Sequence, residues 1–107
     1  MDVPSQFARY PCGDYFASSF AEHGHWCEPS QLWVILPARQ IEELTDFDGS
    51  PLDFLRVGDA GVNGIPFGYR IGHAGVWAYY PIDSDFVFIA SSVQGLVDRW
   101  DAGKVTL

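Results

Sequence analysis

Lysine is nearly absent from this chain, and basic residues of any kind are few. Lys104 is the sole lysine, and six Lys and Arg residues face 14 Asp and Glu residues, giving a formal net charge of −8. A surface that binds nucleic acid needs clustered cations that displace counterions from phosphate groups. We therefore expect no nucleic-acid partner.

Long apolar runs and cysteines are also scarce. The longest apolar runs, such as 32–36 and 86–90, have five residues, whereas a membrane-spanning helix needs about 20. Residues 1–7 show no basic region followed by an apolar stretch, so no secretory signal is visible. Two cysteines, Cys12 and Cys27, are too few for a disulfide-dense secreted scaffold. We expect a cytoplasmic protein that makes no membrane contact and keeps its thiols reduced.

Apolar and aromatic residues, by contrast, are abundant. They make up 48% and 16% of the 107 residues, respectively. This is the length of one small domain, whose single core should bury roughly 65% of the surface of the unfolded chain. We predict one folded domain over residues 1–107, without a linker or an internal repeat.

Two short helices are predicted in the first half of the chain. Over residues 13–24, Phe and Ala side chains recur at helical spacing, and Asp14 can cap the first turn. Pro37 suits the first turn of a second helix, in which Ile41 and Leu44 would face the core.

Strands dominate the remainder. Residues 25–30 are expected to form a connection, and the apolar run 31–36 is typical of a strand buried on both faces. Four further strands are predicted after a turn-rich loop, at 53–57, 65–71, 76–80 and 85–90. The loops between them are too short for parallel crossovers, so these strands should form an antiparallel meander.

The clearest helical pattern closes the chain. An apolar stripe at i, i+3, i+4 and i+7 is formed by Val93, Leu96, Val97 and Trp100. Ser91 and Gln94 form a capping-box pattern, and Gly103 can end the helix. The element order predicts an α+β fold, with an antiparallel meander sheet of about four to five strands and helices packed on one face.

Three segments carry a resemblance to a known family. Residues 32–44, LWVILPARQIEEL, look like a strand leading into a short helix, and residues 54–69, FLRVGDAGVNGIPFGY, look like a strand, a glycine-and-acid loop and a strand. Residues 76–80, VWAYY, and 86–97, FVFIASSVQGLV, look like an aromatic strand and a closing unit of strand, Ala-Ser-Ser and helix. Together they resemble the SUKH superfamily, named after fungal cell-wall regulators of the Knr and Smi type. That family usually begins with two helices, so the chain resembles a member trimmed at its N-terminus.

The resemblance implies a binding role and no enzymatic activity. Many bacterial SUKH members resemble immunity proteins that neutralise toxins, often nucleases, and others look like regulatory scaffolds. Neither role demands a catalytic residue or a cofactor. For this chain it implies a small immunity-type protein whose acidic surface docks on a basic toxin or other protein partner and occludes it.

The aromatic strand and the acidic loops supply the candidate partner-binding residues. Strand alternation places Trp77 and Tyr79 on one sheet face and Val76, Ala78 and Tyr80 on the other. One face must be core, and either all these rings are buried or some remain exposed for interaction. We expect the partner to be bound by Asp59, Asp83 and Asp85 in loops and by Tyr69, Trp77 and Tyr79 on strands.

Other chemistry is weaker in the sequence. His23, His25 and Cys27 alternate and could share a strand face, but their spacing matches no common zinc pattern, so we predict no metal. The acid pairs 46/48 and 83/85 are more typical of solvated turns than of Ca²⁺ or acid–base sites. Two alternatives stay open: a regulatory or structural homo-oligomer that buries its aromatic residues against its own copy, and a small zinc- or ligand-binding domain at the histidine–cysteine corner.

Overall fold

The computed structural model describes residues 1–61 and 64–107. The helices are η1 (Ser5–Phe7), α1 (Gly13–Ala17), α2 (Phe20–His23), η2 (Ala38–Gln40) and α3 (Val93–Asp101). The strands are β1 (His25–Cys27), β2 (Leu32–Ile35), β3 (Glu42–Thr45), β4 (Pro51–Asp59), β5 (Pro66–Arg70), β6 (His73–Tyr80) and β7 (Asp85–Ala90). Within the described ranges, no helix combines the length and apolarity that crossing a bilayer requires.

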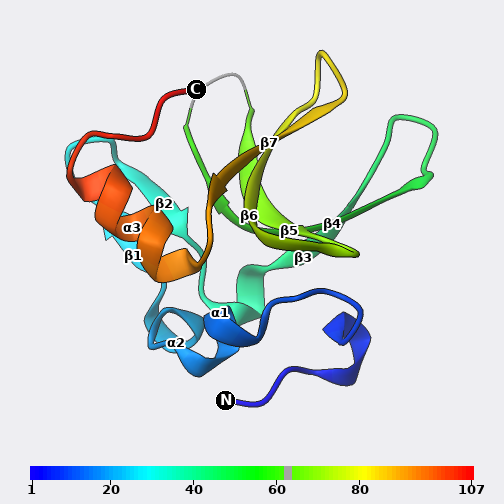
Figure 1. Ribbon diagram of the computed structural model, residues 1–107, viewed down its shortest axis with the longest axis horizontal. Coiled ribbons are helices and arrows are strands. Elements are labelled where there is room, and N and C mark those ends of the chain that lie inside the picture. Colours follow the sequence, from blue (N-terminus) through cyan, green and yellow to red (C-terminus); the bar gives the residue numbers. More distant parts are fainter. Residues whose placement is uncertain (62–63) are drawn as a thin grey trace.

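The strands form two antiparallel sheets. One has five strands in the order β3-β4-β5-β6-β7, and the other consists of β1 and β2 alone. Helix α3 and the β1–β2 pair lie on one side of the larger sheet, with α1 and α2 below them, while two hairpins diverge on the other side (Figure 1). The predicted α+β class and the antiparallel meander are confirmed, because every neighbouring pair in the larger sheet is consecutive in the chain.

The first predicted helix is wrong as a single element. Ser18 has an extended backbone (φ −89°, ψ 165°), which divides the segment into α1 and α2. Asp14 does not cap α1 with its side chain. Its carboxylate instead accepts hydrogen bonds from the Tyr69 hydroxyl (2.9 Å) and from the backbone N–H of Val93 at the start of α3 (2.8 Å). An acid in the first helix therefore joins three elements.

Two other local predictions are also wrong. Residues 25–27 form β1 instead of a connection, with Trp26 paired opposite Trp33. The segment after Pro37 makes only the single turn η2 and then enters β3, where Glu43 pairs with Leu55 of β4. Cross-strand pairing along a sheet edge outweighs the helical preference of Glu and Leu here, since propensity is a weak constraint beside tertiary contacts.

Helix α3 has the predicted apolar face but begins one residue later than its predicted cap. Ser92 is the N-cap, and its hydroxyl accepts a hydrogen bond from the backbone N–H of Gly95 at 3.0 Å. The sequence predicted Ser91 as the cap instead, paired with Gln94. Gly103 follows the helix with a φ of +70°, as predicted for the stop.

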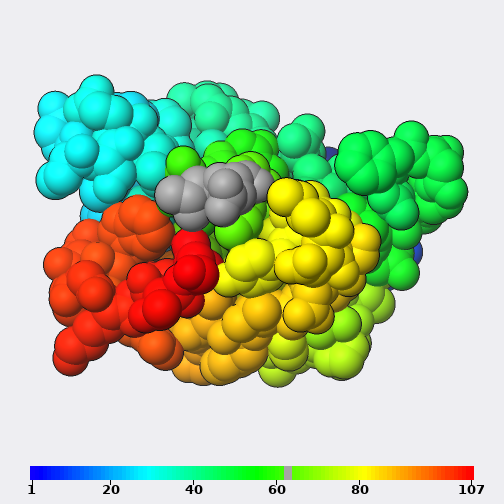
Figure 2. Space-filling model, turned by 90° about the horizontal axis from the view of Figure 1, so that it is seen from above, coloured from blue at the N-terminus to red at the C-terminus, as the bar shows by residue number. Residues whose placement is uncertain are grey.

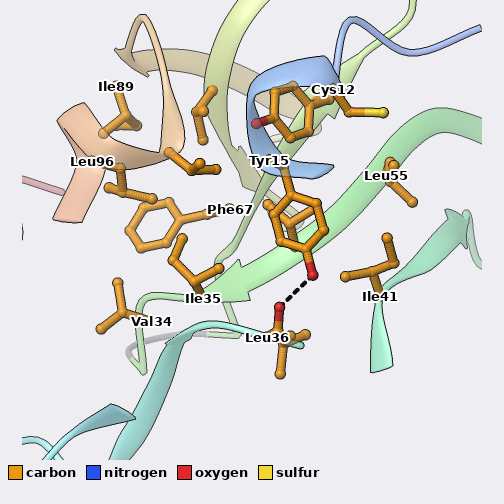
Figure 3. Close-up of a cluster of buried hydrophobic side chains, with 14 of the residues drawn as sticks. Cys12, Tyr15, Val34, Ile35, Leu36, Ile41, Leu55, Phe67, Ile89 and Leu96 are labelled. Carbon is orange, nitrogen blue, oxygen red and sulfur yellow. Dashed lines mark hydrogen bonds between the residues drawn. The ribbon is translucent and has the colours of Figure 1, made fainter. Parts of the chain in front are cut away.

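The core lies between the larger sheet, α1, α3 and the β1–β2 pair. Figure 3 shows side chains from all these parts meeting, including Tyr15, Ile35, Phe67 and Leu96. The hydroxyl of buried Tyr15 donates to the carbonyl of Leu36 at 2.6 Å, so the polar end of this large ring is satisfied inside the core (Figure 3).

The two sheets approach each other through a glycine. A Cβ at Gly58 would lie 1.8 Å from the carbonyl oxygen of Val34, a distance that no side chain can occupy. Nearby, the N–H of Leu36 donates to the carbonyl of Val57 at 2.7 Å. The backbone of β4 therefore packs directly on the end of β2, which fixes the smaller sheet against the larger one.

Candidate protein-binding surface

Strand β6 separates the two faces of the larger sheet. Val76 and Ala78 are fully buried and belong to the core, whereas Trp77 and Tyr79 lie on the opposite, outer face. The alternation predicted from the sequence is therefore present. Because α3 and the β1–β2 pair cover the inner face, the outer face is the one left without a covering layer.

An aromatic cluster fills the middle of the outer face. The ring centroid of Phe54 lies 6.0 Å from that of Tyr79 and 5.6 Å from that of Phe86, and the last two are 5.0 Å apart. Phe54 is 0% exposed and Tyr79 only 5%, although both are outside the main core. Gly68 makes room for this cluster, since a Cβ there would lie 2.8 Å from the Phe54 ring. These rings form a packed aromatic base beneath the surface and offer little exposed area for contact with another molecule.

An arginine and two further aromatic rings extend this aromatic cluster. The guanidinium of Arg70 lies 4.2 Å from the Phe86 ring centroid and 4.6 Å from that of Trp77. Phe88 packs edge-on against Trp77 at 5.5 Å and is 51% exposed. Arg and Trp dominate the energetic centres of protein–protein interfaces because they combine a large apolar area with polar groups.

Two hairpins border the outer face, β3–β4 and β6–β7. Figure 1 shows them diverging, and in the space-filling view their tips, green and yellow, lie on the same face (Figure 2). A cavity of about 170 Å³ lies between them, which we call the hairpin notch. It is lined by Thr45, Asp46, Phe47, Leu52, Tyr79 and Pro81.

Each tip carries a large apolar side chain that nothing covers. Phe47 is 99% exposed in the β3–β4 hairpin and Ile82 is 89% exposed in the β6–β7 hairpin. Scattered exposed apolar residues are normal on proteins, but these two stand at the tips that border one notch.

Carboxylates surround both tips without nearby cations in the chain. Asp46 and Asp48 flank Phe47, and Asp83 and Asp85 follow Ile82, while residues 44–55 and 79–90 contain no Lys or Arg. The backbone N–H and the hydroxyl of Ser50 donate to Asp48 and lower the pKa of that carboxyl. Four of the 14 carboxylates therefore lie beside the two apolar tips, in segments that contain no basic residue.

Four of the six predicted partner-binding residues lie on the outer face or on a hairpin that borders it. Asp83 and Asp85 are exposed on the β6–β7 hairpin, and Trp77 and Tyr79 lie on the adjoining outer face. Tyr79 is nevertheless buried under its aromatic neighbours, so it supports this surface from below.

The other two predicted residues lie elsewhere. Tyr69 faces the core and is fully buried, with its hydroxyl bound to Asp14, so its prediction as a contact residue is corrected. Asp59 ends β4 far from the β3–β4 tip, and Arg56 Nε donates to it at 2.9 Å. A carboxylate held by a neighbouring guanidinium adds little to an acidic docking surface.

The exposed residues of the two tips and the cation among the rings were not predicted from the sequence. Phe47 and Ile82 stand inside turn segments rich in Asp, Gly, Ser and Pro, where a chain has no means of burying a large side chain. That signal could have identified both. The position of Arg70 between Trp77 and Phe86 depends on strand register, which the sequence alone does not define.

The histidine–cysteine corner does not assemble as a three-ligand site. His25 and Cys27 share a face of β1 directed at α3, where they meet Asp101 and Trp100, respectively. His23 lies outside this corner, exposed beside Glu22. Across residues 1–61 and 64–107, no three metal-ligating side chains converge.

No protein-family model, curated protein or solved structure matches the chain.

Proposed function

We propose that this domain is a non-enzymatic protein-binding module whose two hairpins bind a basic segment of another protein. The observation that carries the proposal is that exposed Phe47 and Ile82, each flanked by carboxylates, stand at the tips of the two hairpins that border one notch. Exposed apolar tips favour a partner that covers them, and carboxylates without neighbouring cations favour a partner that is positively charged.

Both parts of this surface have a definite energetic role. Complete burial of a Phe or Ile side chain contributes about 1.5–3 kcal/mol each, so the tips supply affinity. The carboxylates at the rim act mainly on the rate of encounter, because a net charge of −8 attracts a basic protein over long distances at low salt. Occlusion of a partner's working surface needs no further chemistry from this domain.

An immunity-type role is the setting that the SUKH resemblance implies for such a module. A basic toxin, for example a nuclease whose cationic cleft binds phosphates, would have the charge that the hairpin tips complement. We therefore propose both that the chain is a member of the SUKH superfamily and that its partner is a basic toxin.

The proposal is tested by selecting partners and then removing one feature of the tips at a time. Random peptides displayed on phage are selected on the wild-type protein, and the affinity of each recovered peptide is measured by calorimetry. We expect peptides that combine Lys or Arg with apolar residues. Their affinity should fall at least about tenfold for Phe47→Ser/Ile82→Ser, the loss of roughly 1.4 kcal/mol or more of apolar burial.

Charge is tested with matched pairs of substitutions. Asp83→Asn/Asp85→Asn should slow association and weaken its dependence on salt, whereas Asp2→Asn/Glu22→Gln removes the same charge away from the hairpins and should leave binding nearly unchanged. Recovery of neutral or acidic peptides, or equal binding by all four proteins, would overturn the proposal. If the recovered peptides lose affinity only when Trp77 and Phe88 are substituted, the interface lies at the other end of the outer face.

A further inference from the structure

A second concave site lies far from the hairpin notch, between β1 and the end of α3. In Figure 2 the cyan β1–β2 part and the orange-to-red C-terminal part of the chain lie side by side. The cavity between them measures about 540 Å³, within the size range of small-molecule sites. Its polar lining includes His25, Cys27, Glu28, Ser30, Trp100 and Asp101.

The thiol of Cys27 is held by donors in this cavity. The indole N–H of Trp100 donates to Cys27 Sγ at 3.3 Å. Hydrogen bonds from Trp100 and from Ser30 lower the pKa of the Cys27 thiol, whereas desolvation and the nearby Asp101 oppose this effect. Donors directed at sulfur stabilise the thiolate, which is the nucleophilic form of cysteine.

An imidazole and a carboxylate complete the cluster. His25 Nε2 lies 3.4 Å from Asp101 Oδ1, on the face of β1 that also carries Cys27. Asp101 and Glu28 both line the cavity. A thiolate site bordered by two carboxylates, on a protein with a net charge of −8, disfavours anionic ligands and favours cationic ones.

Cys12 provides the contrast within the same chain. It is fully buried, its Sγ lies 3.8 Å from the carbonyl of Phe7, and burial raises the pKa of its thiol. Neither cysteine is in a disulfide. The two thiols therefore differ in access and in ionisation, and both differences favour Cys27 as a nucleophile.

We propose that the β1–α3 cavity is a modification site in which Cys27 exchanges with small cationic disulfides and retains one half as a mixed disulfide. The Cys27 thiolate attacks one sulfur of the ligand, forming a new S–S bond while the S–S bond of the ligand breaks. The leaving thiolate takes a proton from water. Cys27 is oxidised and the departing half of the ligand is reduced, so the ligand itself is the oxidant. The retained ammonium-bearing half occupies the cavity beside Asp101 and Glu28.

The site is tested with three disulfides of equal chemistry and different charge. The wild-type protein is incubated at pH 7 with cystamine, 2-hydroxyethyl disulfide or 3,3′-dithiodipropionate, and adduct formation is followed by intact mass and peptide mapping. A peptide with the sequence of residues 25–30, HWCEPS, reports the same cysteine without the fold. We expect modification of Cys27 alone, at least about 100-fold faster than Cys12. The rate ratio of cystamine to dithiodipropionate should exceed that of the peptide by about tenfold.

Two tryptophan variants separate the thiolate donor from a general change of the cavity. Trp100→Phe removes the N–H that reaches Cys27 and should slow cystamine exchange about 3–10-fold at pH 7. Trp26→Phe changes another ring of the cavity lining but removes an N–H that donates to Glu28 and not to Cys27, so it should leave the rate of exchange with the uncharged 2-hydroxyethyl disulfide unchanged. Continued protection of Cys12 shows that each variant remains folded.

Several results would overturn the proposal. Modification of Cys12 at the rate of Cys27, a charge preference equal to that of the free peptide, or exchange slower than in the peptide would each do so. The comparison of wild type with the peptide depends on no variant, so it stands even if Trp100→Phe unfolds the chain. None of these results bears on the hairpin notch, which lies on other elements.

Discussion

The hydrogen bond inside the core offers the most direct test of how this fold is held together. Tyr15 of α1 is fully buried, and its hydroxyl donates at 2.6 Å to the carbonyl of Leu36, which follows β2. Tyr15→Phe removes only the hydroxyl. The ring and its edge-on contact with Phe16, at a centroid distance of 5.0 Å, should be retained. The substitution therefore isolates one polar contact from the packing around it.

The expected loss of stability follows from what the substitution leaves behind. A buried carbonyl that loses its partner costs about 1–3 kcal/mol, and we expect a value near 2 because both Tyr15 and Leu36 are removed from water. A domain of this size has a total free energy of unfolding of roughly 5–15 kcal/mol. With an m value of about 1–2 kcal/mol/M in urea, the unfolding midpoint should fall by about 1–2 M.

Urea unfolding followed by circular dichroism measures this change. Tyr80→Phe is the matched control, since Tyr80 is only partly buried and none of the hydrogen bonds among the described side chains involves its hydroxyl. The control should change the free energy of unfolding by less than about 0.5 kcal/mol. A loss below that value for Tyr15→Phe, or equal losses for both variants, would refute the assignment of this bond as a structural tie between α1 and the end of β2.

Three further predictions concern backbone contact, capping and alkaline pH. Gly58→Ala should destabilise the fold by several kcal/mol, seen as a large fall in the urea midpoint, because its Cβ would lie 1.8 Å from the carbonyl oxygen of Val34. Ser92→Ala should cost about 1 kcal/mol through loss of the α3 cap, whereas Ser91→Ala should cost little, and thermal unfolding of both compares them. Burial and a neighbouring carboxylate raise the pKa of Tyr69 well above its ordinary 10.0. Its contribution to stability is therefore complete below pH 10 and should fall by about 1.4 kcal/mol per pH unit above it, measured by urea unfolding from pH 9 to 11.5.

The sheet was the most predictable part of the fold because its signals are local. Alternating apolar residues and short loops identified the β5 to β7 region, and the predicted strand 85–90 has the bounds of β7. Strands β1 and β3 were missed for a physical reason. Each has three or four residues without a regular apolar pattern, and each is held by its partner strand, through pairs such as Trp26 with Trp33 and Glu43 with Leu55.

The candidate surface was predictable only in part for a related reason. Alternation alone placed Trp77 and Tyr79 on one face, but which face is covered depends on where α3 packs, and that is a tertiary property. The acidic loops were correctly recognised as solvated turns. Their role as two sides of one notch could not be predicted, because the residues of the two tips are more than 30 positions apart in the sequence.

The curvature of the sheet explains why these two hairpins border one notch. Strand pairing sets Phe54 opposite Arg70 and Phe67 opposite Ala78, so register alone would keep Phe54 away from Tyr79 at the far end of β6. Their centroids are nevertheless 6.0 Å apart, which requires a strongly coiled sheet. The pairing of β4 with β5 and of β5 with β6 is irregular at residues 56–58 and 68–70, and such irregularities increase local twist. The coil buries an aromatic base beneath the notch in the unbound protein. A partner would then meet tips that stand on a pre-ordered base, which reduces the entropy lost on binding.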